Sequence, residues 1–305
     1  MILQNQEQVT QDALAVMAQT RDPRLREITT ALVRHLHAFV SEVRLSEHEF
    51  REAIAHIAAL GQETTDSHNE VVLAAGALGV STLVCLLNNG SGGQTGAVAE
   101  TSANLLGPFW RLGSPLIENG GSLIRSDTPG PAMLVDAIVK DTAGRPVAGA
   151  EVDVWHSSPV GLYENQDLEQ AEMNLRGRFV TDACGRFWFW SVKPAGYPVP
   201  IEGTVGKLFK AQGRRNYRPA HVHALIYKEG YKTIPAQVYV DGDPDLETDC
   251  QFGVTRALVG RYVRHDEPAP RPGIESPWYR LDYTFTIEPG EARWPRPPIT
   301  DKVAP

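Results

Sequence analysis

The stretch Ala150-Glu-Val-Asp-Val-Trp155 decides the fold class, because its apolar and charged residues alternate with the period of two that is typical of a half-buried β-strand. Turn-forming sequences such as Asp141-Thr-Ala-Gly-Arg-Pro146 lie between runs of this kind, and no helical pattern separates them. Strands at this density favour an antiparallel β-sandwich. The other strand-like runs are 134–139, 186–192, 221–227, 236–240 and 281–287.

The first third of the chain has a different composition. Only one of the 22 prolines, Pro23, precedes Pro108. Because proline removes a backbone donor and clashes with the preceding helical turn, this third can be helical and the remainder mostly cannot. We therefore expect a mainly β protein with an α-helical N-terminal domain, 1–106, and a β-sandwich domain, 107–305. The apolar spacing predicts helices over 24–43, from the capping box Ser46-x-x-Glu49 onward, over 71–87 as a buried helix, and around 98–105.

Net charge and cysteine content limit the possible partners. The formal net charge of −8, from 37 acidic and 29 basic residues, gives no attraction to phosphate backbones or anionic lipid, so we expect neither nucleic acid nor a membrane as partner. Three cysteines without a CxxC motif argue against a disulfide framework and favour a reducing cytoplasm. We see no secretion signal and no apolar stretch of about 18 residues.

The motif His221-x-His223 lies in one of the strand-like runs, where residues two apart point to the same face and two imidazoles can converge on a metal. Two strand histidines are more often hydrogen-bonded or solvent-facing than ligands. Tyr163 and Tyr197 lie in loops bounded by glycine and proline, where a tyrosine is usually a packing residue. From these residues alone, a metal site and a structural role both remain open.

Taken together, the motifs resemble those of the intradiol ring-cleaving dioxygenases, non-haem ferric enzymes that open catechol-type rings between the two hydroxyls. The resemblance extends over nearly the whole chain. It implies a prealbumin-like sandwich that carries the iron and an N-terminal helical region through which two chains pair as a homodimer. It rests on Leu106-Gly-Pro-Phe109, Val152-Asp-Val-Trp-His156, Gly161-Leu-Tyr163, Leu175-Arg-Gly-Arg-Phe179, Lys193-Pro-Ala-Gly-Tyr-Pro-Val-Pro200, Arg218-Pro-Ala-His-Val-His223 and Gln237-Val-Tyr-Val-Asp-Gly-Asp243.

The resemblance also implies a cofactor and a set of roles. The implied ligands of one non-haem iron(III) per chain are Tyr163, Tyr197, His221 and His223. Phenolate is a hard anionic donor that favours iron(III) over iron(II). In the family's mechanism an aromatic diol or triol gives a proton to Tyr197, and dioxygen cleaves the ring to a dicarboxylic acid of the muconate or maleylacetate type. Arg218 then stabilises negative charge on the ring, and Gln237 positions the oxygen-derived groups.

Within the family, the sequence most resembles the hydroxyquinol 1,2-dioxygenase branch, with catechol and its chloro or alkyl derivatives as alternative substrates. That branch tends to carry an acidic residue where this chain has Gly76, which either packs closely against a neighbour or makes room for a ring substituent. We hypothesise that the pocket accepts a ring bulkier than hydroxyquinol or differently substituted, with a polar contact from Gln251. The implied substrate-binding residues are Leu73, Gly76, Pro108, Phe109, Pro198, Val199, Arg218, Cys250 and Gln251.

Two other classes of protein share part of this pattern. The segment 135–150 also resembles non-enzymatic prealbumin-like binding modules, which do not need the downstream tyrosines, arginine and His-x-His. A zinc hydrolase would need a third ligand and a general-base carboxylate, and neither is identifiable. An apolar stripe on the helix over 24–43 is available either for pairing with a second chain or for packing on the sandwich of the same chain. It consists of Leu25, Ile28, Leu32, Leu36 and Phe39.

Overall fold

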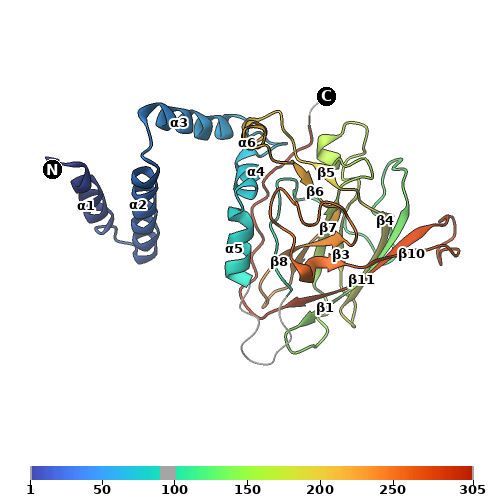
Figure 1. Ribbon diagram of the computed structural model, residues 1–305. Coiled ribbons are helices and arrows are strands. Elements are labelled where there is room, and N and C mark those ends of the chain that lie inside the picture. Colours follow the sequence, from blue (N-terminus) through green and yellow to red (C-terminus); the bar gives the residue numbers. More distant parts are fainter. Residues whose placement is uncertain (1, 90–100, 304–305) are drawn as a thin grey trace. The chain divides into compact units, whose positions relative to one another are not determined.

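The computed structural model describes residues 2–89 and 101–303, and the chain divides into two compact units, Met1–Ala58 and Ala59–Pro305 (Figure 1). The larger unit therefore includes helices that the sequence assigned to the N-terminal domain. The predicted domain boundary at residue 106 stays a prediction.

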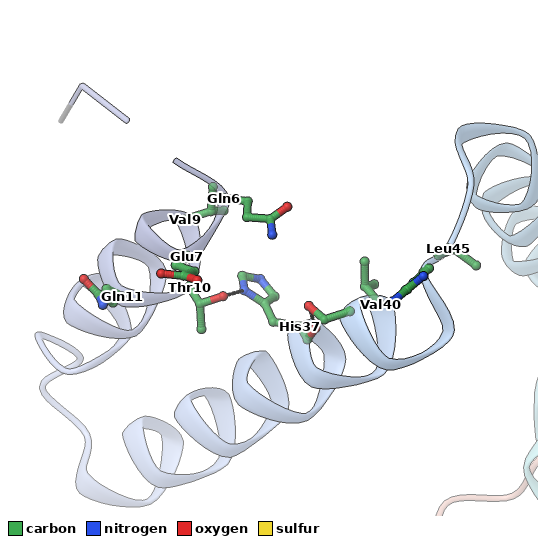
Figure 2. Close-up of a pocket in the computed structure, with 10 residues that line it drawn as sticks. Gln6, Glu7, Val9, Thr10, Gln11, His37, Val40 and Leu45 are labelled. Atoms are coloured by element: carbon green, nitrogen blue, oxygen red, sulfur yellow. Dashed lines mark hydrogen bonds between the residues drawn. The ribbon is translucent and has the colours of Figure 1, made fainter. Parts of the chain in front are cut away.

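The smaller unit is helical, as the sequence predicted. It contains α1 (Gln6–Met17), α2 (Pro23–Val43) and the beginning of α3 (Glu47–Gln62). Asp22 caps α2, and the predicted capping box forms because the Glu49 carboxylate accepts from the Ser46 N–H at 2.9 Å. Figure 2 shows α1 beside α2, where the Thr10 hydroxyl lies 2.9 Å from Nδ1 of His37.

The predicted helix over 71–87 is two helices, α4 (Glu70–Ala77) and α5 (Val80–Asn89). Gly79, with φ +73°, causes the break, because the left-handed region is open to glycine and ends a helix. Burial was predicted correctly for most of α4 but wrongly for α5, of which only Thr82 is buried. No helix in the described ranges is long and apolar enough to span a membrane; α4 and α5 pass that test only as a pair, bent by 74°.

The predicted short helix around 98–105 is not formed by residues 101–105, which have no regular structure, and residues 98–100 lie outside the described ranges. A helix that the sequence did not predict, α6 (Thr204–Gln212), packs against α4 (Figure 1). These two helices bring together segments that are far apart in the sequence.

Two sheets form the sandwich, so the mainly β fold class is confirmed. The first has the order β10-β11-β1-β4 and the second the order β3-β2-β7-β8-β9. A separate pair, β5 with β6, lies outside them. The bounds of the strands are, for the first sheet, β1 Ala132–Asp141, β4 Arg186–Val192, β10 Tyr262–His265 and β11 Trp278–Ile287; for the second, β2 Glu151–His156, β3 Arg176–Val180, β7 His221–Tyr227, β8 Ile234–Val240 and β9 Val259–Gly260; and for the pair, β5 Tyr197–Pro198 and β6 Tyr217–Arg218.

The core lies between the inward faces of the two sheets. Val135 and Phe189 of the first sheet and Val154 and Val222 of the second belong to one buried apolar cluster. The pairing is antiparallel as predicted except for β1 with β11 and β8 with β9, which are parallel. These strands are far apart in sequence and reach their partners through long connections, which allow parallel pairing as a hairpin does not.

Candidate metal centre

Two tyrosines and two histidines bring their polar atoms to one point inside the larger unit. The hydroxyl of Tyr163 lies 3.3 Å from that of Tyr197 and from Nε2 of His221, and 3.1 Å from Nε2 of His223. The two imidazole Nε2 atoms are 3.1 Å apart. All four side chains are at most 2% exposed.

Three separate segments supply these side chains, and local geometry explains how they meet. His221 and His223 are two apart on β7 and so point to the same face. Tyr197 forms β5, and Tyr163 precedes a short 3₁₀ helix. Gly161 permits the approach of the two tyrosines, because its φ is +82° and a Cβ there would lie 3.0 Å from Cβ of Tyr197.

Both histidines are neutral, and His221 presents a lone pair at the meeting point. Nδ1 of His221 is 2.7 Å from the carbonyl oxygen of Pro219, so this nitrogen donates and Nε2 carries the lone pair. Burial, with help from the Arg218 guanidinium, lowers the pKa of His221 to about 3. Burial and the neighbouring His221 lower the pKa of His223 well below its ordinary value.

The tyrosines need a cation in order to ionise. Burial raises the pKa of Tyr163 well above its ordinary value, and the Tyr197 side chain raises it further. Burial also raises the pKa of Tyr197, although Arg218 acts in the opposite direction. A metal ion at the meeting point reverses this effect, because it stabilises the phenolate form.

The four donors fit a bound metal ion. Ligand atoms about 2.1 Å from a metal are about 3.0 Å apart at right angles and about 3.4 Å apart in a tetrahedron, which brackets the separations of 3.1–3.3 Å observed here. Two phenol oxygens with two imidazole nitrogens suit a hard ferric ion. Within the described ranges no three His, Cys, Asp or Glu side chains could hold a metal, so the zinc hydrolase lacks its third ligand.

Arg218 lies beside the donors in a buried network. Its Nη1 is 3.4 Å from Nε2 of His221. Its Nε and Nη2 donate to both carboxylate oxygens of Asp249 at 3.0 and 3.1 Å, and Nη2 also donates to Gln237 and Tyr239. Burial raises the pKa of Asp249, but Arg218 outweighs it and the pKa is lowered overall. The network holds a fixed positive charge at the edge of the centre.

Both ends of the Gln237 side-chain amide form hydrogen bonds with other residues of the protein. Its Oε1 accepts from Arg218 and from the Tyr239 hydroxyl, both at 2.8 Å, and its Nε2 donates to the Leu105 carbonyl at 2.7 Å. Asn104 completes the arrangement by donating to the Tyr239 hydroxyl at 3.2 Å. Sequence reasoning missed Asp249, Tyr239 and Asn104, because none of them has a local motif and each reaches the centre by tertiary packing.

Most of the predicted pocket residues lie together. One buried apolar cluster contains Tyr163 and Tyr197 with four of them, and Pro108 is also buried. The Phe109 ring is 4.7 Å from that of Tyr163 and 6.4 Å from that of Tyr197. Pro198 is different, since its side chain is exposed on β5. The four in the cluster are Leu73, Phe109, Val199 and Cys250.

The space beside Gly76 is filled by Gln251. A Cβ at Gly76 would lie 2.8 Å from Oε1 of Gln251, so the close-packing reading of this glycine fits the structure and the reading of an open space for a bulkier ring does not. Gln251 is 1% exposed, and its Nε2 has no hydrogen-bond partner among the described residues. A buried amide donor without a partner is costly, so this nitrogen is free to donate to an acceptor that is not part of the chain.

Comparisons with known sequences identify the family of the chain. Residues 106–287 match the family model described as Dioxygenase, and residues 22–96 match the one described as Catechol dioxygenase N terminus. The chain is 35% identical over 273 residues to hydroxyquinol 1,2-dioxygenase of Nocardioides simplex, covering 88% of this chain and 91% of that protein. It is 36% identical over 287 residues to 6-chlorohydroxyquinol 1,2-dioxygenase of Cupriavidus pinatubonensis, covering 93% and 98%.

A solved structure of a related protein has a similar fold. The structure of hydroxyquinol 1,2-dioxygenase from Pseudomonas putida DLL-E4 matches with a TM-score of 0.80 at 35% identity, covering 93% of this chain and 98% of that one.

Proposed function

This chain belongs to the intradiol ring-cleavage dioxygenase family, and we propose that Tyr163, Tyr197, His221 and His223 hold one non-haem iron(III) ion in it. The observation that carries the proposal is the convergence of two phenol oxygens and two imidazole nitrogens at 3.1–3.3 Å. When bound, iron(III) withdraws electron density from a chelated diol and so makes the ring reactive toward dioxygen. The reaction cleaves the ring between the two hydroxyls and gives a dicarboxylic acid.

The residues around the centre have separate tasks. Tyr197 Oη accepts a proton from one hydroxyl of the incoming diol. Arg218 Nη1 faces the donors and stabilises the negative charge of the deprotonated diol, since Asp249 holds its other nitrogens in place. Gln237 also fixes the guanidinium, because its Oε1 accepts from the Nη2 that contacts Asp249. Phe109, next to Tyr163, excludes water from the ring of the substrate.

For the substrate, we propose hydroxyquinol or a catechol with a hydrogen-bond acceptor on the ring. The unpartnered Nε2 of Gln251 supports this choice, because bare catechol leaves that donor unsatisfied. The closeness of Gln251 to Gly76 argues against the bulkier ring hypothesised from the sequence. Catechol and chlorocatechols are the alternative substrates, and kcat/KM values for hydroxyquinol, catechol and 4-chlorocatechol decide between them.

Colour and product together test the activity. Iron-loaded protein is expected to be red-brown from tyrosinate-to-iron(III) charge transfer, and to consume dioxygen while forming an ultraviolet-absorbing dicarboxylate. A colourless protein that binds zinc instead of iron, or a yellow semialdehyde product from cleavage outside the two hydroxyls, contradicts the proposal.

We also propose that the protein is a homodimer of the cytoplasm. The stripe on α2 formed by Leu25, Ile28, Leu32, Leu36 and Phe39 supports pairing, because each of these side chains is 48–54% exposed. The three cysteines are free thiols, which suits a reducing compartment. Sedimentation of the wild type and of a Leu32→Glu, Leu36→Glu variant tests the dimer: the variant is expected to be monomeric, and a monomeric wild type contradicts the proposal.

A further inference from the structure

Arg214 joins the end of α4 to the loop that carries Gln251. Its Nη1 donates to the carbonyl oxygen of Ala77 at 2.9 Å, and its Nη2 donates to the carbonyl oxygen of Cys250 at 2.8 Å. Ala77 follows Gly76 in the chain, and Cys250 precedes Gln251. One side chain therefore sets the separation of the two backbones between which Gly76 and Gln251 meet.

Two aromatic rings hold the guanidinium of Arg214 in this position. The guanidinium carbon lies 4.7 Å from the ring centroid of Phe209 on α6 and 5.0 Å from that of Phe252. A cation in this position is attracted electrostatically to the face of each ring. Phe252 follows Gln251 in the chain. Arg214 thus contacts the residue on either side of Gln251, one through a carbonyl oxygen and the other through a ring.

The loop around Gln251 has a backbone conformation that needs such support. Phe252 has φ +56°, in the left-handed region, which is unfavourable for a bulky side chain. The Asp249 carboxylate accepts from the N–H groups of Gln251 and Gly253, at 3.2 and 2.9 Å. The hydroxyl of Thr82 donates to the Gln251 carbonyl oxygen at 3.1 Å. An unfavourable backbone conformation persists only while the surrounding contacts enforce it, so the loop depends on its anchors.

The position of the Gln251 amide depends on the backbone that carries it. Its Nε2 has no hydrogen-bond partner in the described part of the chain, so no such bond fixes this end of the side chain. A hydrogen bond from an N–H group to an oxygen is made within about 3.2 Å, and a small displacement of the loop is enough to lose it. Contacts that fix the loop therefore decide whether the amide reaches a substrate.

We propose that Arg214 is a positioning residue for substrate choice: it holds the Gln251 amide where the hydroxyl that distinguishes hydroxyquinol from catechol accepts from Nε2. The inference rests on the substrate contact of Gln251 proposed above. Arg214 acts from outside the metal centre, since it has no hydrogen bond to the four donor side chains within the described ranges.

A simpler role for Arg214 is to cap α4. A basic side chain at a helix C-terminus satisfies carbonyl groups that have no partner in the helix, and the carbonyl of Ala77 is one of these. A cap alone affects the stability of the protein but not its choice between two diols. Substrate selectivity therefore separates the two roles.

The selectivity of Arg214→Met tests the proposal. Methionine keeps an apolar side chain beside the two rings but donates to neither carbonyl. The ratio of kcat/KM for hydroxyquinol to that for catechol is expected to fall, by at most the roughly tenfold that one hydrogen bond is worth. Anaerobic titration of the iron-loaded protein with each diol, followed through its charge-transfer absorption, is expected to show the same change in the ratio of dissociation constants.

Two further variants show whether the effect passes through the amide. When Arg214→Met is added to Gln251→Leu, the ratio is expected to stay as in Gln251→Leu, since no amide remains to be displaced. Arg215→Met is the matched control and is expected to keep the wild-type ratio. Arg215 packs over Tyr217 and pairs with Asp245, and it has no hydrogen bond to α4 or to residues 250–252 in the described part of the chain.

If Arg214→Met does not fold, Arg214→Lys keeps the charge but lacks the planar fork that donates to both carbonyls, and the ratio is expected to fall in the same direction. A folded Arg214 variant with the wild-type ratio overturns the positioning role, whatever its thermal stability. A wild-type ratio in Gln251→Leu overturns the substrate contact itself, so the two failures are distinguishable.

Discussion

Nε2 of His221 lies 3.1 Å from Nε2 of His223, and the His221 nitrogen carries a lone pair because the other nitrogen of that ring donates to Pro219. A proton between the two rings is disfavoured, since burial lowers the pKa of both histidines. A bound cation can accept the lone pair of His221 Nε2, and that of His223 Nε2 when the proton of that ring is on Nδ1. The buried phenols of Tyr163 and Tyr197 complete the same donor set.

Replacing one phenol ligand tests this donor set. Tyr163→Phe removes an oxygen donor but keeps the ring that packs on Phe109. We expect the visible charge-transfer absorption to weaken strongly and kcat/KM to fall by at least about 100-fold, because even residues that only support metal ligands are worth about 10- to 100-fold. Absorption spectra and iron content provide the measurement. Tyr279→Phe, in the other sheet, is the control, and a Tyr163→Phe protein with wild-type colour contradicts the assignment.

The sequence was sufficient for the fold class, whereas the iron ligands were implied by the family resemblance and stay a prediction. The period of two identified β1, β2, β4, β7, β8 and β11 but not the five shorter strands, and the motif residues Tyr163, Tyr197, His221 and His223 do lie together. Local pattern could not reveal the break at Gly79, because the apolar run continues through it, nor the parallel pairing of β11 with β1, which depends on tertiary contacts.

The residues that hold the side chains of the centre in place were harder to predict, because they also depend on tertiary contacts. Asp249 holds Arg218 from 31 residues away, and Asn104 reaches Tyr239 from a separation of 135 residues. The contact of Gly76 with Gln251 depends on how α4 packs, which no local pattern contains.

Removing the carboxylate that holds Arg218 tests whether the position of Arg218 affects catalysis independently of metal binding. Asp249→Asn leaves Arg218 buried beside an uncharged partner, so we expect unfolding free energy to fall by about 3–5 kcal/mol and kcat to fall with the iron still bound. Thermal unfolding, iron content and steady-state kinetics measure the three effects. Asp266→Asn breaks an exposed carboxylate–arginine pair with Arg264, and it is expected to leave the unfolding free energy nearly unchanged. Equal effects of the two substitutions contradict the role of Asp249.

His156 is expected to make the folded protein less stable as the pH falls. Its Nδ1 lies 2.7 Å from the Ser157 carbonyl oxygen and its Nε2 2.7 Å from the Ser191 hydroxyl, and burial lowers its pKa from 6.5 to about 4. Between these two values the unfolded chain binds the proton and the folded chain does not. The stability contributed by the neutral ring is therefore complete above pH 6.5 and is lost as the pH falls toward 4, by an amount of order 3 kcal/mol.

Urea unfolding at several pH values between 7 and 4 measures this effect. His156→Gln is expected to be less stable than the wild type at pH 7 but to lose less stability on acidification. His48→Gln changes an exposed histidine and is expected to keep the pH dependence of the wild type. A His156→Gln protein with an unchanged pH dependence shows that other groups account for the acid sensitivity.

Gly76 and Gln251 together offer the sharpest test of substrate choice. Gly76→Ala places a Cβ only 2.8 Å from Oε1 of Gln251, and the flexible end of that side chain can move aside. Alanine also favours the helix by up to about 1 kcal/mol, so we expect nearly unchanged stability. The displaced amide no longer meets the ring, and the ratio of kcat/KM for hydroxyquinol to that for catechol is expected to fall about tenfold, equivalent to one hydrogen bond. Gln251→Leu is expected to lower the ratio by a similar factor, and the double variant no further, because both changes remove the same contact. Additive effects, or a ratio that stays constant in Gln251→Leu, mean that this amide does not contact the substrate.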